Sequence, residues 1–321
     1  MTVRPSLAPR PPAAPSSAET VIEVTDLRMS YGATEVLKGV TFTVRRGEVV
    51  ALLGPNGVGK STTIEILEGF RVRSAGRVAV LGADPAHGDR RWRSEIGVVL
   101  QSWADHGKWQ VRELITHLGA YYTPYTRESV NRPWDPDALL ELVGLTSLAR
   151  QKLRRLTQGQ RRRLDVAIGL VGRPQLLFLD EPTVGFDPRA RHDFHEMIRQ
   201  LVETEQTTIV LATHDLAEAE RLSHRILLLA GGRIIADGSA EHLAQRAGTG
   251  AEVRWSRDGR RFHASTSLPA RFVHQLYEEY GVGIGDLEVH QASLEQTYLT
   301  LVRDWGSGRT AQSGAFSARP Q

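Results

Sequence analysis

Residues 49–67 read VVALLGPNGVGKSTTIEIL, and this stretch decides the fold class. Its centre, residues 54–61, matches the phosphate-binding loop pattern GxxxxGK[ST] at every fixed position. An apolar run precedes the loop at 49–53, and residues 62–67 have the composition of a helix start. A chance match in a chain of 321 residues is about a 1 in 100 event, and the strand and helix context makes it rarer. The stretch therefore predicts a nucleotide site.

Each position of this loop has a chemical task. Glycines allow backbone conformations in which several N–H groups point at phosphate oxygens. Lys60 then reaches the β- and γ-phosphates, the Ser61 hydroxyl ligates Mg²⁺, and the helix that follows directs its N-terminus at the anion. The predicted nucleotide-binding residues of the loop are Gly54, Pro55, Asn56, Gly57, Val58, Gly59, Lys60, Ser61 and Thr62.

A second apolar run, at 176–179, ends in the acids Asp180 and Glu181. A carboxylate beside a magnesium nucleotide can hold the metal, which is the predicted role of Asp180. The next residue, Glu181, is the predicted general base that polarises the attacking water. Alone, two acids at a strand end are most simply a solvated pair. Together with a phosphate-binding loop upstream, they indicate catalysis.

The continuous apolar runs at 49–53, 176–179 and 209–212 predict buried parallel strands, because helices cover both faces of such a sheet. Ligands of open α/β sheets bind at the carboxyl ends of the strands, where these runs end in polar residues. We therefore expect an α/β fold with a mainly parallel core sheet. Earlier β-forming segments at 21–24 and 40–44 predict an antiparallel subdomain, and Gly231 and Gly232 predict a hairpin turn.

Composition divides the chain into regions. Prolines near the start predict a disordered leader, helical spacing of Val111, Leu114, Ile115 and Leu118 predicts a helical insertion, and later strands and helices predict a small α+β extension. The expected regions are a leader at 1–20, a nucleotide-binding domain at 21–240 with a helical subdomain at about 102–160, an accessory region at 241–303 and a flexible tail at 304–321.

Composition also excludes several classes of function. The chain has no cysteine, which rules out disulfides, thiolate metal sites and a cysteine nucleophile. No apolar run approaches the roughly 18 residues of a membrane helix, and we expect no secretory signal. The net charge of +3 is too small to predict nucleic-acid binding, so no nucleic-acid partner is expected.

The order of these motifs resembles the nucleotide-binding subunit of an ABC transporter over about residues 21–240. The segment LTQGQ at 156–160 resembles the signature of that family, usually written LSGGQ, and it precedes a helical pattern. The other positions that match the family are Gln101 for the Q-loop, Asp187 for the D-loop acid, His214 for the switch histidine and Tyr31 for the aromatic that stacks on adenine. The resemblance implies that Gln101 and His214 are catalytic residues in addition to Glu181. It also implies that Gln101 is an Mg²⁺ ligand together with Ser61 and Asp180.

The signature departs from the common form at two positions. Thr157 replaces serine and keeps the hydroxyl, whereas Gln158 replaces a glycine and removes one permissive backbone position. Gly159 and Gln160 remain. The resemblance implies that Thr157, Gly159 and Gln160 contact the γ-phosphate of an ATP held by the other subunit of a head-to-tail dimer, and that signature and phosphate loop of one chain do not meet.

The resemblance also implies partners. ATP and Mg²⁺ are the expected cofactors, a second ATPase subunit (most simply another copy) completes the site, and a separate transmembrane permease is driven from the cytoplasmic face of the membrane. The C-terminal stretch LEVHQASLEQTYL at 287–299 and GFDP at 185–188 are similar to ATPases of bacterial drug and antibiotic exporters of the daunorubicin-resistance type. We therefore expect drug, antibiotic or other small-molecule efflux.

Two alternatives remain open: a soluble ABC ATPase that acts on ribosomes or nucleic acid, and an importer ATPase. One phosphate loop and no sustained heptads disfavour the first, and the exporter-like C-terminal stretch disfavours the second. Charged clusters are interpreted as structural. The arginines at 154–155 and 161–163 are expected to form a solvated helix face, and His192 and His195 are expected at the surface.

Overall fold

The computed structural model describes residues 19–99, 107–128, 130–205, 207–248, 251–257, 260–266, 268–290 and 293–307. Contacts between Cα atoms divide the chain into two compact units, an N-terminal unit at Met1–Ser239 and a C-terminal unit at Ala240–Gln321.

The strands of the described residues form three sheets. Their bounds are β1 Thr20–Tyr31, β2 Thr34–Arg45, β3 Val49–Leu53, β4 Ala75–Val80, β5 Ile96–Val99, β6 Leu176–Asp180, β7 Thr208–Thr213, β8 Arg225–Ala230, β9 Arg233–Gly238, β10 Ala251–Arg257, β11 Arg260–Thr266 and β12 Gly285–His290.

Helices separate most of the strands. The α-helices are α1 Lys60–Leu67, α2 Arg90–Ser94, α3 Val111–Ala120, α4 Pro136–Leu142, α5 Gln158–Leu170, α6 Pro188–Glu205, α7 Leu216–Leu222, α8 Ala240–Arg246, α9 Pro269–Tyr280 and α10 Leu294–Gly306. Short 3-10 helices lie at Pro85–His87, Thr123–Tyr125, Thr146–Leu148, Leu153–Arg155 and Gly281–Gly283.

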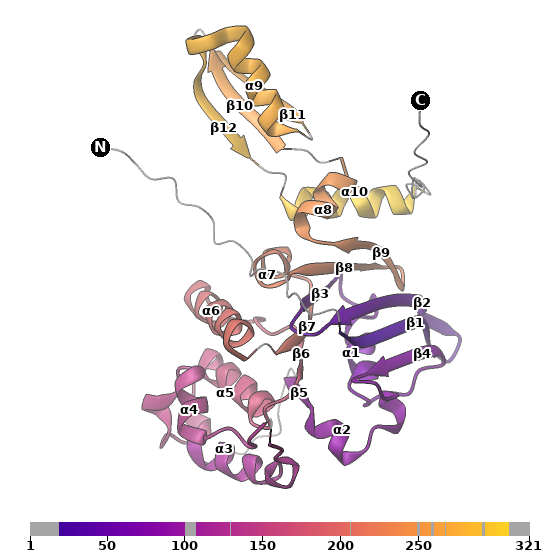
Figure 1. The fold of residues 1–321 in the computed structure, drawn as a ribbon, viewed down its shortest axis with the longest axis vertical. Coiled ribbons are helices and arrows are strands. Elements are labelled where there is room, and N and C mark those ends of the chain that lie inside the picture. The colour runs from indigo at the N-terminus through magenta and orange to yellow at the C-terminus, as the bar shows by residue number, and fades with distance from the viewer. Residues whose placement is uncertain are drawn as a thin grey trace. The chain divides into compact units, whose positions relative to one another are not determined.

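A six-stranded sheet with the order β5-β6-β7-β3-β8-β9 forms the centre of the N-terminal unit (Figure 1). The first five strands of this order are parallel, and β9 pairs antiparallel with β8 around Gly231 and Gly232. The three predicted parallel strands are β3, β6 and β7, and the predicted hairpin is β8–β9. The register places the end of β6, Asp180, beside Ala212 of β7. The α/β fold class with a mainly parallel core sheet is therefore confirmed.

A three-stranded antiparallel sheet, β2-β1-β4, shares one hydrophobic core with the central sheet. Ile64 and Leu67 of α1 are buried in this core together with Phe178 of β6 and Leu37 of β2. The helix that follows the phosphate loop is thus fixed by packing on both sheets. That packing fixes the direction in which the N-terminus of α1 points.

Helices α3, α4 and α5, which lie at and beyond the region expected to form a helical subdomain, pack on one another. α5 also packs on β5 and continues to Leu170, so helical structure extends beyond the expected boundary at residue 160. In the described part of the chain, no helix has the length and apolar character needed to cross a membrane.

The C-terminal unit contains a second three-stranded antiparallel sheet, β11-β10-β12, which α9 covers on one face. Trp255 of β10 stacks on Phe262 at 5.7 Å between ring centroids and contacts Phe272 of α9 edge-on at 5.8 Å. These strands and helices agree with the small α+β extension expected from the sequence. α10 ends at Gly306, two residues beyond the expected start of the tail at residue 304.

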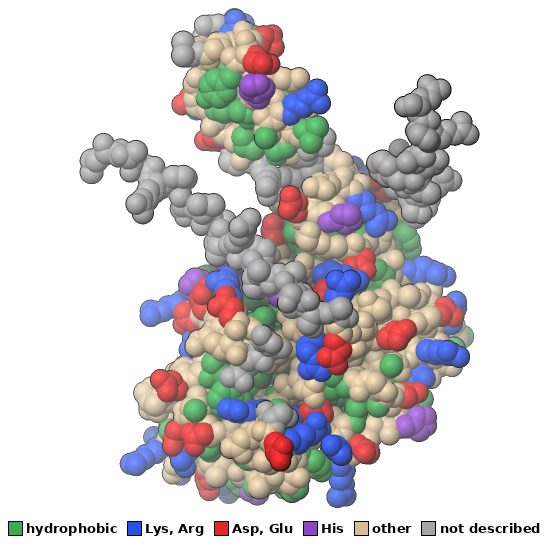
Figure 2. Space-filling model, viewed as in Figure 1, with side chains coloured by type: hydrophobic (Ala, Val, Ile, Leu, Met, Phe, Trp, Pro, Cys, Tyr) green, Lys and Arg blue, Asp and Glu red, His purple; other side chains and the backbone are tan. Residues whose placement is uncertain are grey.

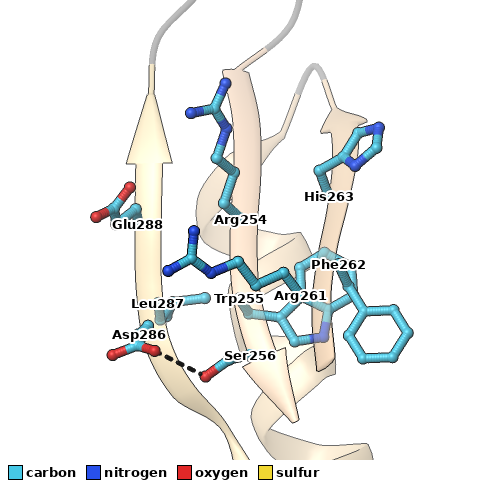
Figure 3. A pocket seen from close by; sticks show the side chains of 9 residues that line it. All are labelled: Arg254, Trp255, Ser256, Arg261, Phe262, His263, Asp286, Leu287 and Glu288. Carbon is cyan, nitrogen blue, oxygen red and sulfur yellow. Dashed lines mark hydrogen bonds between the residues drawn. The ribbon is translucent and has the colours of Figure 1, made fainter. Parts of the chain in front are cut away.

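The other face of this sheet carries charged side chains of both signs. Arg254, Arg261 and Glu288 line a cavity of about 770 Å³ there, and Asp286 accepts a hydrogen bond from Ser256 at 3.1 Å. Figure 3 shows these side chains. Register supports a common face, because Arg254 lies opposite both His263 and Glu288. On the face drawn in Figure 2, blue and red side chains of the described residues are interspersed as well.

Candidate functional site: a nucleotide cavity at the carboxyl ends of the strands

The phosphate-binding loop connects β3 to α1, and its glycines are required by space and by backbone conformation. A Cβ atom on Gly54 would lie 2.4 Å from the carbonyl oxygen of Leu229, a contact that no side chain could make. Gly59 has φ +110°, and a Cβ there would lie 2.5 Å from Leu37 Cδ2. Only glycine therefore allows the loop to turn this closely over the sheets.

Lys60 is the first residue of α1 and is only 5% exposed. Its Nζ donates to the carbonyl oxygens of Gly54 at 2.9 Å and Pro55 at 3.3 Å. The same Nζ lies 3.3 Å from Glu181 Oε1. The ammonium group is thus fixed at the mouth of the loop, where the phosphate chemistry predicted from the sequence needs a cation.

Ser61 and Asp180 lie together, as a shared magnesium ion requires. The Ser61 hydroxyl hydrogen-bonds to the Asp180 carboxylate, and burial raises the pKa of that carboxyl group. No cluster of three or more His, Cys, Asp or Glu side chains suited to a metal occurs among the described residues. A hydroxyl and a carboxylate leave most positions of an oxygen-liganded Mg²⁺ to water and phosphate, which is the usual arrangement for this ion. The residues therefore fit the metal.

Glu181 and His214 form a pair across the ends of β6 and β7. His214 Nδ1 lies 2.7 Å from Glu181 Oε2, and the Glu181 N–H donates to the carbonyl oxygen of Ala212 at 2.9 Å. Glu181 has φ +47°, a left-handed conformation that is strained for a non-glycine residue. Such strain persists where surrounding structure holds a side chain in a required direction. Here that direction is toward Lys60 and His214.

These groups line one cavity of about 640 Å³. Asn56, Gly57 and Ser61 contribute from the phosphate loop, and Glu181 and His214 from the strand ends. Gln158, at the start of α5, lines the same cavity, although Thr157, Gly159 and Gln160 are not among its lining residues. Gln158 thus faces the same cavity as the phosphate loop, and the expectation that the signature contacts the ATP of a second subunit stays a prediction. The side-chain amide of Gln158 packs against Gly185, two residues before the D-loop acid Asp187. A Cβ atom on Gly185 would lie 2.2 Å from Gln158 Nε2.

The signature side chains Thr157 and Gln160 cap their own helix. Thr157 Oγ1 accepts from the Gln160 N–H at 3.3 Å, and Gln160 Oε1 accepts from the Thr157 N–H at 3.0 Å. This is a reciprocal capping box, and it fixes the start of α5 at Gln158. The sequence pattern T-x-x-Q at 157–160 is that of a capping box, whereas Thr157 and Gln160 are predicted from the sequence only to contact a γ-phosphate.

The remaining predicted positions lie at the periphery. Asp187 caps α6, because its Oδ1 accepts from the N–H groups of Arg189 and Ala190 at 2.9 Å each. Tyr31 ends β1 with 43% of its surface exposed, and the Arg71 guanidinium lies 5.0 Å from its ring centroid. Gln101 falls outside the described residues.

A family model described as "ABC transporter" matches residues 37–184. The chain is 40% identical to a Nod factor export ATP-binding protein I of Rhizobium sp. (strain N33) over 71% of its own length and 74% of the relative. The chain belongs to the ABC transporter ATP-binding family. The cassette fold is also that of a solved ATP-binding subunit of an ABC transporter (28% identity, TM-score 0.61, 71% of this chain and 94% of the other). A second is cbiO1 from Clostridium perfringens, part of the transporter complex cbiONQ (27% identity, TM-score 0.60, 70% and 90%).

Membership confirms three predictions: this ABC ATPase binds ATP, uses Mg²⁺ and hydrolyses ATP in a transport process. The Ser61–Asp180 contact and the Glu181–His214 pair lie at the same end of the sheet as the phosphate loop, and their roles in this chemistry stay predictions.

Sequence reasoning missed Arg162, which links the signature helix of the ABC ATPase to its catalytic strand. Arg162 is 8% exposed, and its guanidinium donates to the carbonyl oxygens of Asp180 and Pro182 at 3.0 Å each. The interpretation of residues 161–163 as a solvated face is therefore wrong for Arg162. An arginine run alone cannot show which member turns inward, because that depends on the facing strand.

Two further buried groups were not predicted. Glu218 of α7 is 1% exposed and hydrogen-bonds to Thr183 and Thr213, which connects the segments after β6 and β7; burial raises its pKa. His195 of α6 is 3% exposed, so its expected place at the surface is wrong. Burial lowers the pKa of His195 to about 4, and the side chain is therefore a neutral part of the helix packing.

Proposed function

We propose that this chain is the ATP-hydrolysing motor of an ABC exporter that drives a small molecule through a separate membrane permease. The observation that carries the proposal is the convergence of Ser61, Asp180, Glu181 and His214 at one end of the sheet. Export is supported by the names of the curated relatives, which are Nod factor export proteins. The expected cargo is a drug, an antibiotic or another small molecule.

Hydrolysis follows from positions and charges. The P-loop N–H groups and Lys60 would hold the β- and γ-phosphates, and Ser61 and Asp180 would hold the magnesium ion. When bound, Mg²⁺ neutralises charge that develops on the phosphate oxygens. Glu181 accepts the proton of the attacking water, and His214, 2.7 Å from Glu181, keeps that carboxylate directed at the γ-phosphate. The bond between the γ-phosphorus and the bridging oxygen breaks as the water oxygen bonds to phosphorus.

A second copy of the chain is expected to complete the site. Thr157 and Gln158 are exposed, and the capping box satisfies the N–H groups of Thr157 and Gln160. The N–H groups of Gln158 and Gly159 have no acceptor within the described residues, as is usual for the first turn of a helix. An exposed helix start with free N–H groups can receive a phosphate from a facing subunit.

A groove between the sheet and the helical insertion is the proposed seat of the permease. It encloses about 380 Å³ and is lined by Trp92, Ile96, Tyr122 and the side chain of Phe70, which is 68% exposed. An exposed phenylalanine beside an apolar cavity is a typical anchor point for a partner helix. On this proposal the chain acts at the cytoplasmic face of the membrane.

Glu181→Gln tests the motor. Removing a general base typically lowers the rate about 10²–10⁴-fold, while the neutral amide leaves ATP binding intact. We expect Glu181→Gln to form an ATP-dependent dimer on gel filtration and to purify with a polytopic membrane protein from native membranes. Glu23→Gln, on the exposed side of β1, is the matched control and should hydrolyse ATP normally.

The same preparation separates the alternatives. Ribosomal proteins or nucleic acid in place of a membrane protein would favour the soluble ATPase. The direction of transport is measured in membrane vesicles that contain the complex. ATP-dependent uptake of cargo into inverted vesicles corresponds to export from the cell. ATP-dependent uptake that occurs only into right-side-out vesicles would favour an importer. Unchanged turnover in Glu181→Gln would rule out its assignment as the base.

A further inference from the structure

An arginine-lined pocket lies at the end of the central sheet opposite the phosphate loop. It encloses about 530 Å³, and Arg46, Arg127 and Arg173 line it together with Trp134. Arg46 lies in the turn before β3, whereas the phosphate loop follows the other end of β3. This arginine pocket therefore shares no residue with the nucleotide cavity.

Arg173 has no charged partner within the described residues. Its guanidinium lies 4.1 Å from the ring centroid of Trp134, and its buried Nε has no hydrogen-bond partner in this part of the chain. The backbone is held from both sides, because the Arg173 N–H donates to Leu170 O at 2.8 Å and its carbonyl accepts from Arg132 at 3.2 Å. A guanidinium stacked on a ring keeps the N–H groups of its edge available for an anion.

The facing wall is a chain of polar contacts around Glu95. Arg127 and Arg132 both pair with this buried carboxylate, and Gln175 donates to it at 2.8 Å. Gln175 in turn accepts from Arg46 at 2.8 Å. Although burial opposes ionisation, the hydrogen bonds from Arg132 and Gln175 hold the pKa of Glu95 below its usual value. The wall is thus charged and fixed in position.

The charges of the described side chains around this pocket do not balance. Four arginines (Arg46, Arg127, Arg132 and Arg173) meet two paired glutamates, Glu95 and the exposed Glu19, which lies 2.6 Å from Arg46. Among the side chains that the structure describes, no carboxylate lines the cavity. A purely structural cluster would need only Arg127, Arg132 and Glu95 to fasten the helical insertion to the sheet. Arg173 is not explained by that role.

We propose that the arginine pocket binds a phosphate-bearing small anion, distinct from the ATP that the chain hydrolyses. A phosphomonoester carries nearly the two negative charges that the cluster lacks, and guanidinium groups bind phosphate oxygens in pairs. The volume exceeds that of a phosphate group, and Trp134, Leu170 and Leu201 supply apolar surface for the rest of the molecule.

The test measures inorganic phosphate binding by calorimetry. Full-length Lys60→Ala is the parent, because this change weakens the phosphate grip of the nucleotide site. We expect saturable phosphate binding in the parent and a loss of at least tenfold in affinity in Lys60→Ala with Arg173→Gln. Arg257→Gln in the same parent is the matched control, since Arg257 also stacks on a ring, that of Tyr280 at 4.3 Å, outside the pocket.

The outcomes separate the proposal from the motor function. Absence of saturable binding in the parent, or equal affinity with and without Arg173, would overturn the proposal. Thermal denaturation of each variant checks folding, and Arg173→Lys, which keeps the charge but loses the planar fork, should bind with intermediate affinity. Arg173→Gln in the otherwise unchanged chain should hydrolyse ATP, so a failed phosphate test leaves the motor proposal standing.

Two further arms identify the source of the phosphate. Tighter binding of succinate than of phosphate at equal ionic strength would contradict the phosphate assignment. Phosphatidic acid is a lipid whose headgroup is a phosphomonoester. Sedimentation with vesicles that contain it, but not with pure phosphatidylcholine vesicles, would assign the phosphate to a lipid headgroup, provided that Arg173→Gln abolishes the sedimentation. Calorimetric binding without sedimentation assigns it to a soluble molecule.

Discussion

The proposed nucleotide site depends on single side chains, and the predicted stacking of Tyr31 on adenine can be tested by one substitution. Tyr31→Ala is expected to weaken ATP binding by about 1–3 kcal/mol, the range for a base stacked on an aromatic ring. The ring is exposed enough to accept adenine, and Arg71 already stacks on it. Equilibrium titration with a fluorescent ATP analogue measures the change. Tyr31→Phe keeps the ring and should bind normally; unchanged affinity in Tyr31→Ala would reduce Tyr31 to packing.

Glu68 makes stability depend on pH. Burial raises its pKa to about 8, so the folded chain holds this proton where the unfolded chain has lost it. Its penalty on stability is absent below about pH 4.5, grows through the window up to about pH 8 and is constant above it. Glu68→Gln should therefore be more stable than the parent at pH 8.5, by on the order of 5 kcal/mol at about 1.4 kcal/mol per pKa unit.

Urea denaturation at several pH values measures this difference. The exposed Glu141, changed to glutamine, is the matched control, because its carboxyl lies in water in both states. A difference between Glu68→Gln and the parent that is the same at pH 5 and pH 8.5 would contradict the prediction.

At the scale of an element, α5 begins where its capping box begins. Thr157→Ala removes the hydroxyl that accepts from the Gln160 N–H and should lower the free energy of unfolding by about 1 kcal/mol. Thr157→Ser keeps the hydroxyl and should restore the stability, as followed by urea denaturation. Equal stability of the alanine and serine variants would show that the box contributes nothing.

The elements also show what the sequence could predict and why. The strands β3, β6 and β7 could be predicted because each is a continuous apolar run. The turn before α1 could be predicted because its backbone leaves no room for a Cβ atom at Gly54 and Gly59. β11 was missed because RRFHAST alternates weakly and depends on β10 for its pairing. The burial of Arg162 and His195 was not predicted for a related reason. Arginine and histidine occur both at the surface and in the interior, and whether a given side chain is buried depends on the element that packs against it.

At the scale of the whole molecule, the chain divides at Ser239. All members of the core cluster that joins the two sheets of the N-terminal unit precede this residue. A chain that ends at Ser239 is therefore expected to fold and to bind ATP with the affinity of the full chain. Circular dichroism and nucleotide titration test this. Loss of the folded signal would show that the C-terminal unit contributes to the stability of the first.

The contact between Lys60 Nζ and Glu181 Oε1 at 3.3 Å has a consequence for timing. The phosphates of an arriving nucleotide compete with this carboxylate for the same ammonium group. On the proposed mechanism, phosphates that take the place of Glu181 at this ammonium group free the carboxylate for the attacking water. The proposed base would then become available only when a phosphate is present to be attacked.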